Sequence, residues 1–99
     1  MTTKILEFKK TDHFLYSQWD RNINDQILYN VLPFVECTKC HKDVIIVKPS
    51  FLKRKGIKSR NNECLVIITS NNVLITCYWC DHTDYLYSKD SFAHFQILK

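Results

Sequence analysis

Four of the five cysteines form two Cys-x-x-Cys pairs, Cys37–Cys40 and Cys77–Cys80, which residues 41–76 separate. Two intervening residues allow both sulfurs of a tight turn to point at one ion, and two such turns complete a tetrahedron of thiolates. We therefore expect one structural zinc ion bound by Cys37, Cys40, Cys77 and Cys80, with no coordination position left for water or substrate. Zinc binding of this kind contributes ~10–16 kcal/mol, so folding would depend on the metal.

Other interpretations of the cysteines stay open. The four thiols could be free core residues, because cysteine is often buried. One pair could be a redox dithiol, and the string Cys37-x-x-Cys40-His41 also matches a haem-attachment motif. His82 in place of Cys80, or His41 in place of another cysteine, would give a mixed ligand set. The fifth cysteine, Cys64, begins an apolar run, and we expect it to be a buried, inert thiol.

Residues 1–33 show mainly helical patterning. Phe14, Leu15, Gln18 and Trp19 share one predicted helical face. Apolar residues then recur at helical spacing at Ile23, Ile27, Leu28, Val31 and Leu32. We expect Asn22 or Asn24 to cap the second helix and Pro33 to stop it. Ile5, Leu6 and Phe8 fit a short strand equally well.

The β-branched residues after position 33 predict strands over 44–47, 65–69 and 73–76. Asn71-Asn72 lies between the last two, and asparagine tolerates the positive φ of a tight hairpin. Residues 85–87 are a possible fourth strand, and the tail 92–98 fits either helix or strand. These strands are apolar on both faces, so the N-terminal helices or a partner protein must cover the second face.

The two cysteine pairs and the strands between them resemble a zinc ribbon over residues 34–88. The resemblance implies an α+β fold: a small antiparallel zinc-ribbon sheet in a domain of residues 34–99, with the N-terminal helical segment 1–33 packed on it as one compact unit. Zinc ribbons serve transcription, replication and translation machinery, or act as structural modules. His41 and Asp81 replace the glycine that often follows a knuckle, and Asn71-Asn72 lacks the acidic pair of transcript-cleavage ribbons, so we do not expect that activity.

A basic segment over residues 53–60 carries five positive charges and no negative one, more than the net charge of +4 of the whole chain. We expect it to form a flexible loop that contacts the phosphates of DNA or RNA, helped by Lys39, Lys42 and Lys48. Phe51 would stack on a base or anchor the loop to the core. A solvated loop, an acidic protein partner and a nuclear localisation signal are the alternatives. The predicted nucleic-acid-binding residues are Lys53, Arg54, Lys55, Lys58 and Arg60.

Tyr78 and Trp79 lie between the cysteines of the second pair. Aromatic residues at the tip of a knuckle are exposed, so we expect them to bind a protein partner in a larger complex. The alternative is that one of the two packs onto the N-terminal helices.

The composition is that of a globular protein, with 45% hydrophobic and 24% charged residues. No apolar run is long enough to cross a bilayer, and the first ten residues lack the apolar core of a secretory signal. We therefore expect an intracellular protein, nuclear or cytoplasmic, without membrane contact. A single Gly and a single Ala beside many Lys, Asn and Ile indicate an AT-rich genome, as in some viruses, so a protein of virus-infected cells is one expectation.

Two functions follow from these patterns. The first is a structural-zinc ribbon that contacts nucleic acid within a transcription or replication assembly. The second is a structural or interaction subunit, for example of a viral complex or virion, with no nucleic-acid role. We expect no enzyme, because the chain has no nucleophile elbow and no Gly-rich phosphate loop, and Asp81 and Asp84 do not form a convincing acid–base pair.

Overall fold

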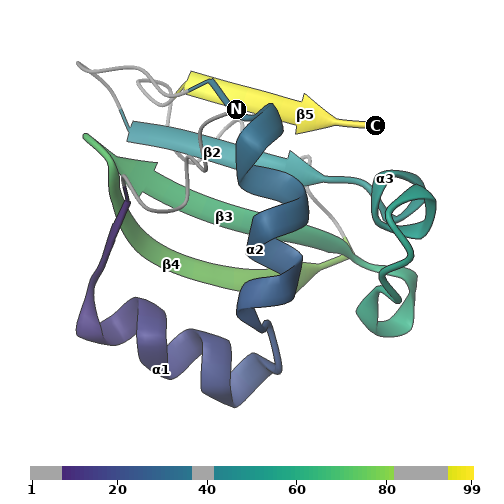
Figure 1. The fold of residues 1–99 in the computed structure, drawn as a ribbon, viewed down its shortest axis with the longest axis horizontal. Coiled ribbons are helices and arrows are strands. Elements are labelled where there is room, and N and C mark those ends of the chain that lie inside the picture. Colours follow the sequence, from purple (N-terminus) through teal and green to yellow (C-terminus); the bar gives the residue numbers. More distant parts are fainter. Residues whose placement is uncertain (1–7, 37–41, 82–93) are drawn as a thin grey trace.

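The computed structural model describes residues 8–36, 42–81 and 94–99, which form one mixed sheet with helices on it (Figure 1). The helical elements are α1 (Asp12–Arg21), α2 (Asp25–Val31), the 3-10 turn η2 (Leu32–Phe34), α3 (Pro49–Arg54) and the 3-10 turn η3 (Arg60–Asn62). The strands are β1 (Lys9–Lys10), β2 (Lys42–Val47), β3 (Cys64–Ser70), β4 (Val73–Cys80) and β5 (His94–Leu98). Their order in the sheet is β1-β4-β3-β2-β5.

Side chains at the N-termini of α1 and α2 bind the free backbone N–H groups there. Thr11 Oγ1 accepts a hydrogen bond from the Phe14 N–H at 3.0 Å, and Asn24 Oδ1 accepts one from the Ile27 N–H at 3.1 Å. Asn22 instead ends α1, in the left-handed conformation with φ of 56°. The predicted cap is therefore Asn24. The helix α2 ends at Val31, two residues before Pro33, and Pro33 lies within the turn η2, which begins at Leu32.

The predicted apolar face of α1 is wrong. Phe14 and Ser17 are the buried residues of this helix, whereas Leu15 and Trp19 are exposed. Residues 14 and 17 lie one turn apart on the side that contacts β4, and positions 15 and 19 fall on the neighbouring side. Two apolar side chains, Leu15 and Trp19, therefore face solvent.

The three central strands confirm the predictions made from β-branched residues. β2 pairs with β3, and β3 pairs with β4, both antiparallel. Asn71 and Asn72 form the turn between β3 and β4 with φ of 51° and 65°, as the hairpin requires. A register shift between Ile68 and Thr69 adds a β-bulge to this pair. The hairpin extends to Cys80, four residues beyond the predicted strand 73–76.

The two edge strands correct the expected antiparallel ribbon. β1 runs parallel to β4, with Lys9 opposite Val73, and β5 runs parallel to β2, with Asp43 opposite His94. The α+β class is therefore confirmed, but the sheet is five-stranded and mixed. Parallel pairs join segments that are distant in the chain, so the local hairpin pattern could not reveal them. The ambiguous tail thus contains a strand, and the predicted strand 85–87 lies outside the described residues, as do Ile5 and Leu6.

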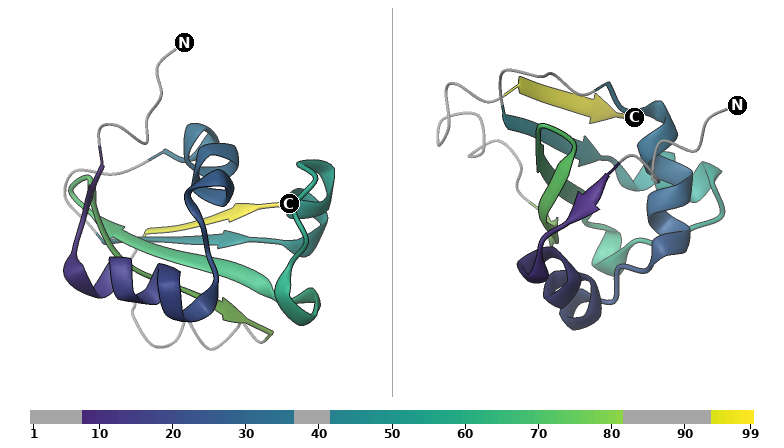
Figure 2. Two further views of the ribbon diagram at one scale, coloured as in Figure 1. Left: turned by 60° about the horizontal axis from the view of Figure 1, so that its bottom comes forward. Right: turned by 60° about the vertical axis from the view of Figure 1, so that its left-hand side comes forward.

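Helices cover one face of the sheet, as both views in Figure 2 show. A first core cluster forms on this face, where Phe14 of α1 and Leu28 of α2 pack with Ile45 and Ile67 of the sheet. The helices α1 and α2 thus share a core with the strands. A second cluster on the other face contains only strand residues among those described: Val44, Ile46, Cys64, Val66 and Cys80. These five are almost fully buried, so their face is not an open apolar surface for a partner.

No helix in the described part of the chain is long and apolar enough to cross a membrane.

Candidate functional site

Cys77 and Cys80 lie on opposite faces of the sheet. Both belong to β4, whose extended backbone alternates its side chains between the two faces. Cys77 is part of the first core cluster beneath the helices, and Cys80 is part of the second. The expected knuckle turn at 77–80 is therefore a continuous strand that pairs with β3 through Cys80. In this conformation the two sulfurs do not converge on one ion.

Cys77 has the surroundings of a core residue. Its side chain is fully buried, and burial raises the pKa of its thiol to about 12, although the charges of Arg21 and Lys10 oppose the shift. A thiol with so high a pKa stays protonated at neutral pH. Deprotonation to a zinc ligand would require the ion to offset this cost, and the end of β4 would have to leave the sheet.

Cys80 has a different neighbour, the fifth cysteine. Cys64 lies directly opposite Cys80 on β3, and both belong to the second core cluster. Burial raises the pKa of the Cys64 thiol, and the nearby ammonium of Lys48 partly opposes this. The buried thiol expected at Cys64 is confirmed. Its pairing with Cys80 was not foreseen, because it depends on the register of β3 and β4.

Cys37, Cys40, His41 and His82 lie outside the described residues. Within residues 8–36, 42–81 and 94–99, no three His, Cys, Asp or Glu side chains are grouped so as to hold a metal ion. The described cysteines, taken in their strand positions, do not fit a four-thiolate zinc site. That site stays a prediction, and no step below depends on it.

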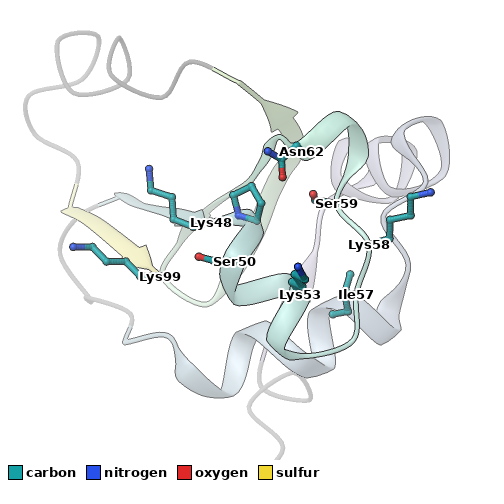
Figure 3. Close-up of a pocket in the computed structure, with 9 residues that line it drawn as sticks. Lys48, Ser50, Lys53, Ile57, Lys58, Ser59, Asn62 and Lys99 are labelled. Atoms are coloured by element: carbon teal, nitrogen blue, oxygen red, sulfur yellow. The ribbon is translucent and has the colours of Figure 1, made fainter.

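A basic groove of about 820 Å³ opens where α3 meets the ends of β2 and β5 (Figure 3). Four lysines contribute to its walls together with hydroxyl and amide groups, and no acidic side chain does. Among the described residues, no acidic side chain forms an ion pair with any of these lysines. The residues that line the basic groove are Lys48, Pro49, Ser50, Lys53, Ile57, Lys58, Ser59, Asn62 and Lys99.

Local structure holds these side chains in place. Pro49 occupies the first turn of α3, where its missing N–H costs nothing. Phe51 and Leu52 are buried, and the next residue, Lys53, is exposed at the groove. Gly56, with φ of +74°, then reverses the chain, and the N–H of Ile57 donates to the Leu52 carbonyl at 2.8 Å. The predicted flexible loop is thus a short helix and a tight turn anchored to the core.

Lys99 reaches the basic groove through the parallel edge strand. The N–H of Lys48 donates to the Leu98 carbonyl at 2.8 Å, which sets the end of β5 beside the end of β2. Sequence reasoning named Lys48 as an extension of the basic surface but missed Lys99. No local signal identifies it, because only the pairing of β2 with β5 brings the two lysines together.

The side chains of Arg54 and Lys55 lie on the rings of Phe51 and Phe34, whereas Lys53 lines the groove. The Lys55 Nζ lies 4.1 Å from the centroid of the Phe34 ring, and the Arg54 guanidinium lies 5.8 Å from that of Phe51. Arg54 also donates to the backbone carbonyl of Lys99. Phe34 and Phe51 pack edge to face with centroids 5.6 Å apart. Phe51 therefore anchors α3 to the core and is not available to stack on a base.

A second hollow of about 380 Å³ borders the basic groove and shares Lys58 and Ser59 with it. Arg60 contributes to its wall and lies 3.9 Å from a carboxylate oxygen of Glu63. The other lining residues are Arg21, Asn22, Ile27, Asn61 and Trp79. Of the five predicted nucleic-acid-binding residues, the structure thus places Lys53, Lys58 and Arg60 along adjoining hollows, and sets Arg54 and Lys55 apart on the aromatic pair.

Tyr78 and Trp79 do not form one exposed tip. Trp79 packs on the first core cluster, and its Nε1–H donates to the Arg21 carbonyl of α1 at 3.0 Å. Tyr78 packs on the second cluster, across the sheet. One of the two thus contacts the N-terminal helices, which was the alternative prediction. Both side chains are half-buried.

Comparisons of the chain with protein-family models, with curated proteins and with solved structures found no match.

Proposed function

We propose that this protein contacts nucleic acid by holding backbone phosphates in the basic groove. The observation that carries the proposal is that four lysines, Lys48, Lys53, Lys58 and Lys99, line one hollow and that no acidic side chain does. Like charges that share a surface repel one another, and a bound polyanion replaces that repulsion with attraction. Lysine and arginine contacts to phosphates dominate the affinity of most nucleic-acid-binding proteins.

The form of the groove favours a chain of phosphates over a single small anion. Three of the lysines come from residues 48–58 and the fourth is Lys99, and they stand around the hollow, with Ser50, Ser59 and Asn62 as neutral donors between them. Side chains of these types make most phosphate contacts in nucleic-acid complexes. The phosphates of DNA or RNA fit this surface, in an assembly for transcription or replication where a small basic module holds the backbone.

The zinc prediction is separate from this proposal, because no cysteine lines the basic groove. The rival function, a protein-interaction subunit with Tyr78 and Trp79 at its contact surface, draws less support from the geometry. These two side chains lie on opposite faces of β4 and pack on the core.

Two double variants with the same change in charge test the proposal. Lys53→Gln with Lys58→Gln removes two charges from the groove, and Arg54→Gln with Lys55→Gln removes two from the aromatic pair beside it. Fluorescence anisotropy with a labelled oligonucleotide at low salt measures the dissociation constant. We expect the first variant to bind at least ~10-fold more weakly, since each phosphate contact supplies a share of the affinity, and the second to bind within ~2-fold of wild type.

An equal loss of affinity in both variants would show that binding depends only on the net charge of the protein. No loss of affinity in the first variant would refute the groove as the binding site. Circular dichroism melting of each variant checks that the fold is intact.

A further inference from the structure

Three hollows are linked to one another by the lining residues that they share. The basic groove shares Lys58 and Ser59 with the second hollow, and the second shares Asn22 with a third of about 380 Å³. The third hollow lies along α1 and the start of α2, and its walls are Lys10, Leu15, Gln18, Trp19, Asn22, Ile23, Asn24 and Asp25. The hollows thus form a track from Lys99 to Trp19.

The net charge of the lining side chains falls along this track, from the basic groove to the third hollow. The basic groove has four lysines, and the second hollow has Arg21, Lys58 and Arg60. In the third hollow the single cation, Lys10, is compensated, because its Nζ lies 2.6 Å from Asp25 Oδ1. One end of the track therefore suits phosphates, and the other end is nearly neutral.

Arg21 keeps positive charge at the middle of the track. The residue lines the second hollow, and its guanidinium charge favours an anion there. Its Nη1 atom is buried and has no hydrogen-bond partner among the described residues.

Aromatic side chains occupy the neutral end. Trp19 is 77% exposed and Tyr16 is 56% exposed, and their ring centroids lie 6.0 Å apart with the planes tilted by 47°. An indole left so open to water forgoes the burial that tryptophan usually finds in a folded chain. A flat apolar ring on the same track as a basic groove can bind an unpaired base, because every base presents a π-face to an aromatic side chain.

We propose that the track binds single-stranded nucleic acid in preference to a duplex, with phosphates in the basic groove and an unpaired base stacked on Trp19. This inference rests on the proposed function and names its ligand class. A duplex offers its phosphates to the lysines, but its bases are stacked on one another and are not free to pack on Trp19. The single strand gains both contacts.

The test compares a single-stranded thymidine oligomer of about 12 nucleotides, within the site sizes known for single-strand-binding folds, with a duplex of the same length. Trp19→Ala is matched by Tyr29→Ala, since Tyr29 is an exposed aromatic of α2 that lines none of the three hollows. Loss of a stacking aromatic should weaken single-strand binding about 5- to 100-fold. Duplex binding by Trp19→Ala, and both affinities of Tyr29→Ala, should stay within about 2-fold of wild type.

Tryptophan fluorescence gives a second measurement. The single strand should quench the emission of wild-type protein, and Trp19→Phe should lose most of that quenching while it keeps most of the affinity, because phenylalanine still stacks. Equal affinity for single strand and duplex, or equal effects of Trp19→Ala and Tyr29→Ala, would overturn the inference and leave the groove intact. The proposed function itself is wrong if neither the single strand nor the duplex binds, or if Lys53→Gln with Lys58→Gln leaves the affinity unchanged.

Discussion

Cys64 and Cys80 are directly opposite residues of β3 and β4, and their side chains lie in the same core cluster. Cys77, three positions before Cys80, lies in the other cluster across the sheet. Cys77, the partner of Cys80 in the Cys-x-x-Cys pair, thus lies across the sheet from it. Cys64, which belongs to neither Cys-x-x-Cys pair, is the neighbour of Cys80.

This pairing predicts which disulfide forms on oxidation. Opposite residues of antiparallel strands have Cα atoms ~4.5–5.5 Å apart, within the ~4.4–6.8 Å that a disulfide spans. With oxidised glutathione, the thiols of Cys64 and Cys80 lose two electrons and two protons, and the reagent is reduced to two glutathione molecules. Peptide mapping should find Cys64 linked to Cys80, and Cys64→Ser should abolish the link. A Cys77–Cys80 disulfide would contradict the strand.

Substitution of Cys77 tests whether this residue is a core residue or a zinc ligand. A core position should tolerate Cys77→Val at a cost of ~1–3 kcal/mol, because valine stays apolar but is larger than cysteine by about one methylene. Cys77→Ser buries a hydroxyl and should lower the free energy of unfolding by ~1–3 kcal/mol. Urea unfolding measures both variants, and native mass spectrometry reads their bound zinc. If both variants lose a bound zinc ion and unfold alike, Cys77 is a ligand and the four-cysteine site is right.

Alkaline pH should destabilise the protein through the same residue. The pKa of Cys77 is raised in the folded state from its ordinary 9.0 to about 12, so the folded chain retains a proton that the unfolded chain releases. The resulting stability is fully present below pH 9.0 and is lost as the pH rises towards 12. Urea unfolding at several pH values should show this decline, and the decline should be shallower in Cys77→Val. Parallel curves for the two proteins would refute it.

Gly56 should be sensitive to substitution although it has space around it. Its φ is +74°, and a Cβ added there would meet nothing within 4 Å. Any cost therefore comes from the left-handed backbone, ~1–2 kcal/mol for alanine. Gly56→Asn is the matched variant, since asparagine adopts this conformation more readily. Thermal melting should rank wild type above Gly56→Asn, and Gly56→Asn above Gly56→Ala.

Salt should weaken oligonucleotide binding in proportion to the phosphates held. Four lysine contacts to a single strand give a slope of about −3 for log K against log salt. Removal of the Lys53 and Lys58 charges should reduce the slope by about 1.5, and removal of Arg54 and Lys55 should leave it unchanged. Anisotropy titrations from low to physiological salt measure these slopes. A flat dependence in wild type would exclude phosphate contact as the source of affinity.

Local features of this chain were predictable from the sequence. The runs of β-branched residues at 44–47 and 65–69 form β2 and β3, and Asn71-Asn72 forms the hairpin turn between β3 and β4. Both were predictable because strand and turn preferences act over a few neighbouring residues. Asn24 capped α2 for the same reason. The basic segment 53–60 was also visible, because charge is a property of composition.

The tertiary structure decided which of those residues meet. Parallel pairing of β5 with β2 brought Lys99 beside Lys48, and the continuation of β4 to Cys80 placed Cys77 and Cys80 on opposite faces. The side of α1 that contacts β4 left Trp19 in solvent. The positions of Lys99 and Trp19 depend on packing between segments that are distant in the chain. The opposite faces of Cys77 and Cys80 follow from the alternation of side chains once β4 continues to Cys80. The sequence by itself therefore determined the elements and the charge, whereas only the packed sheet determined the groove, the thiol pair and the exposed indole.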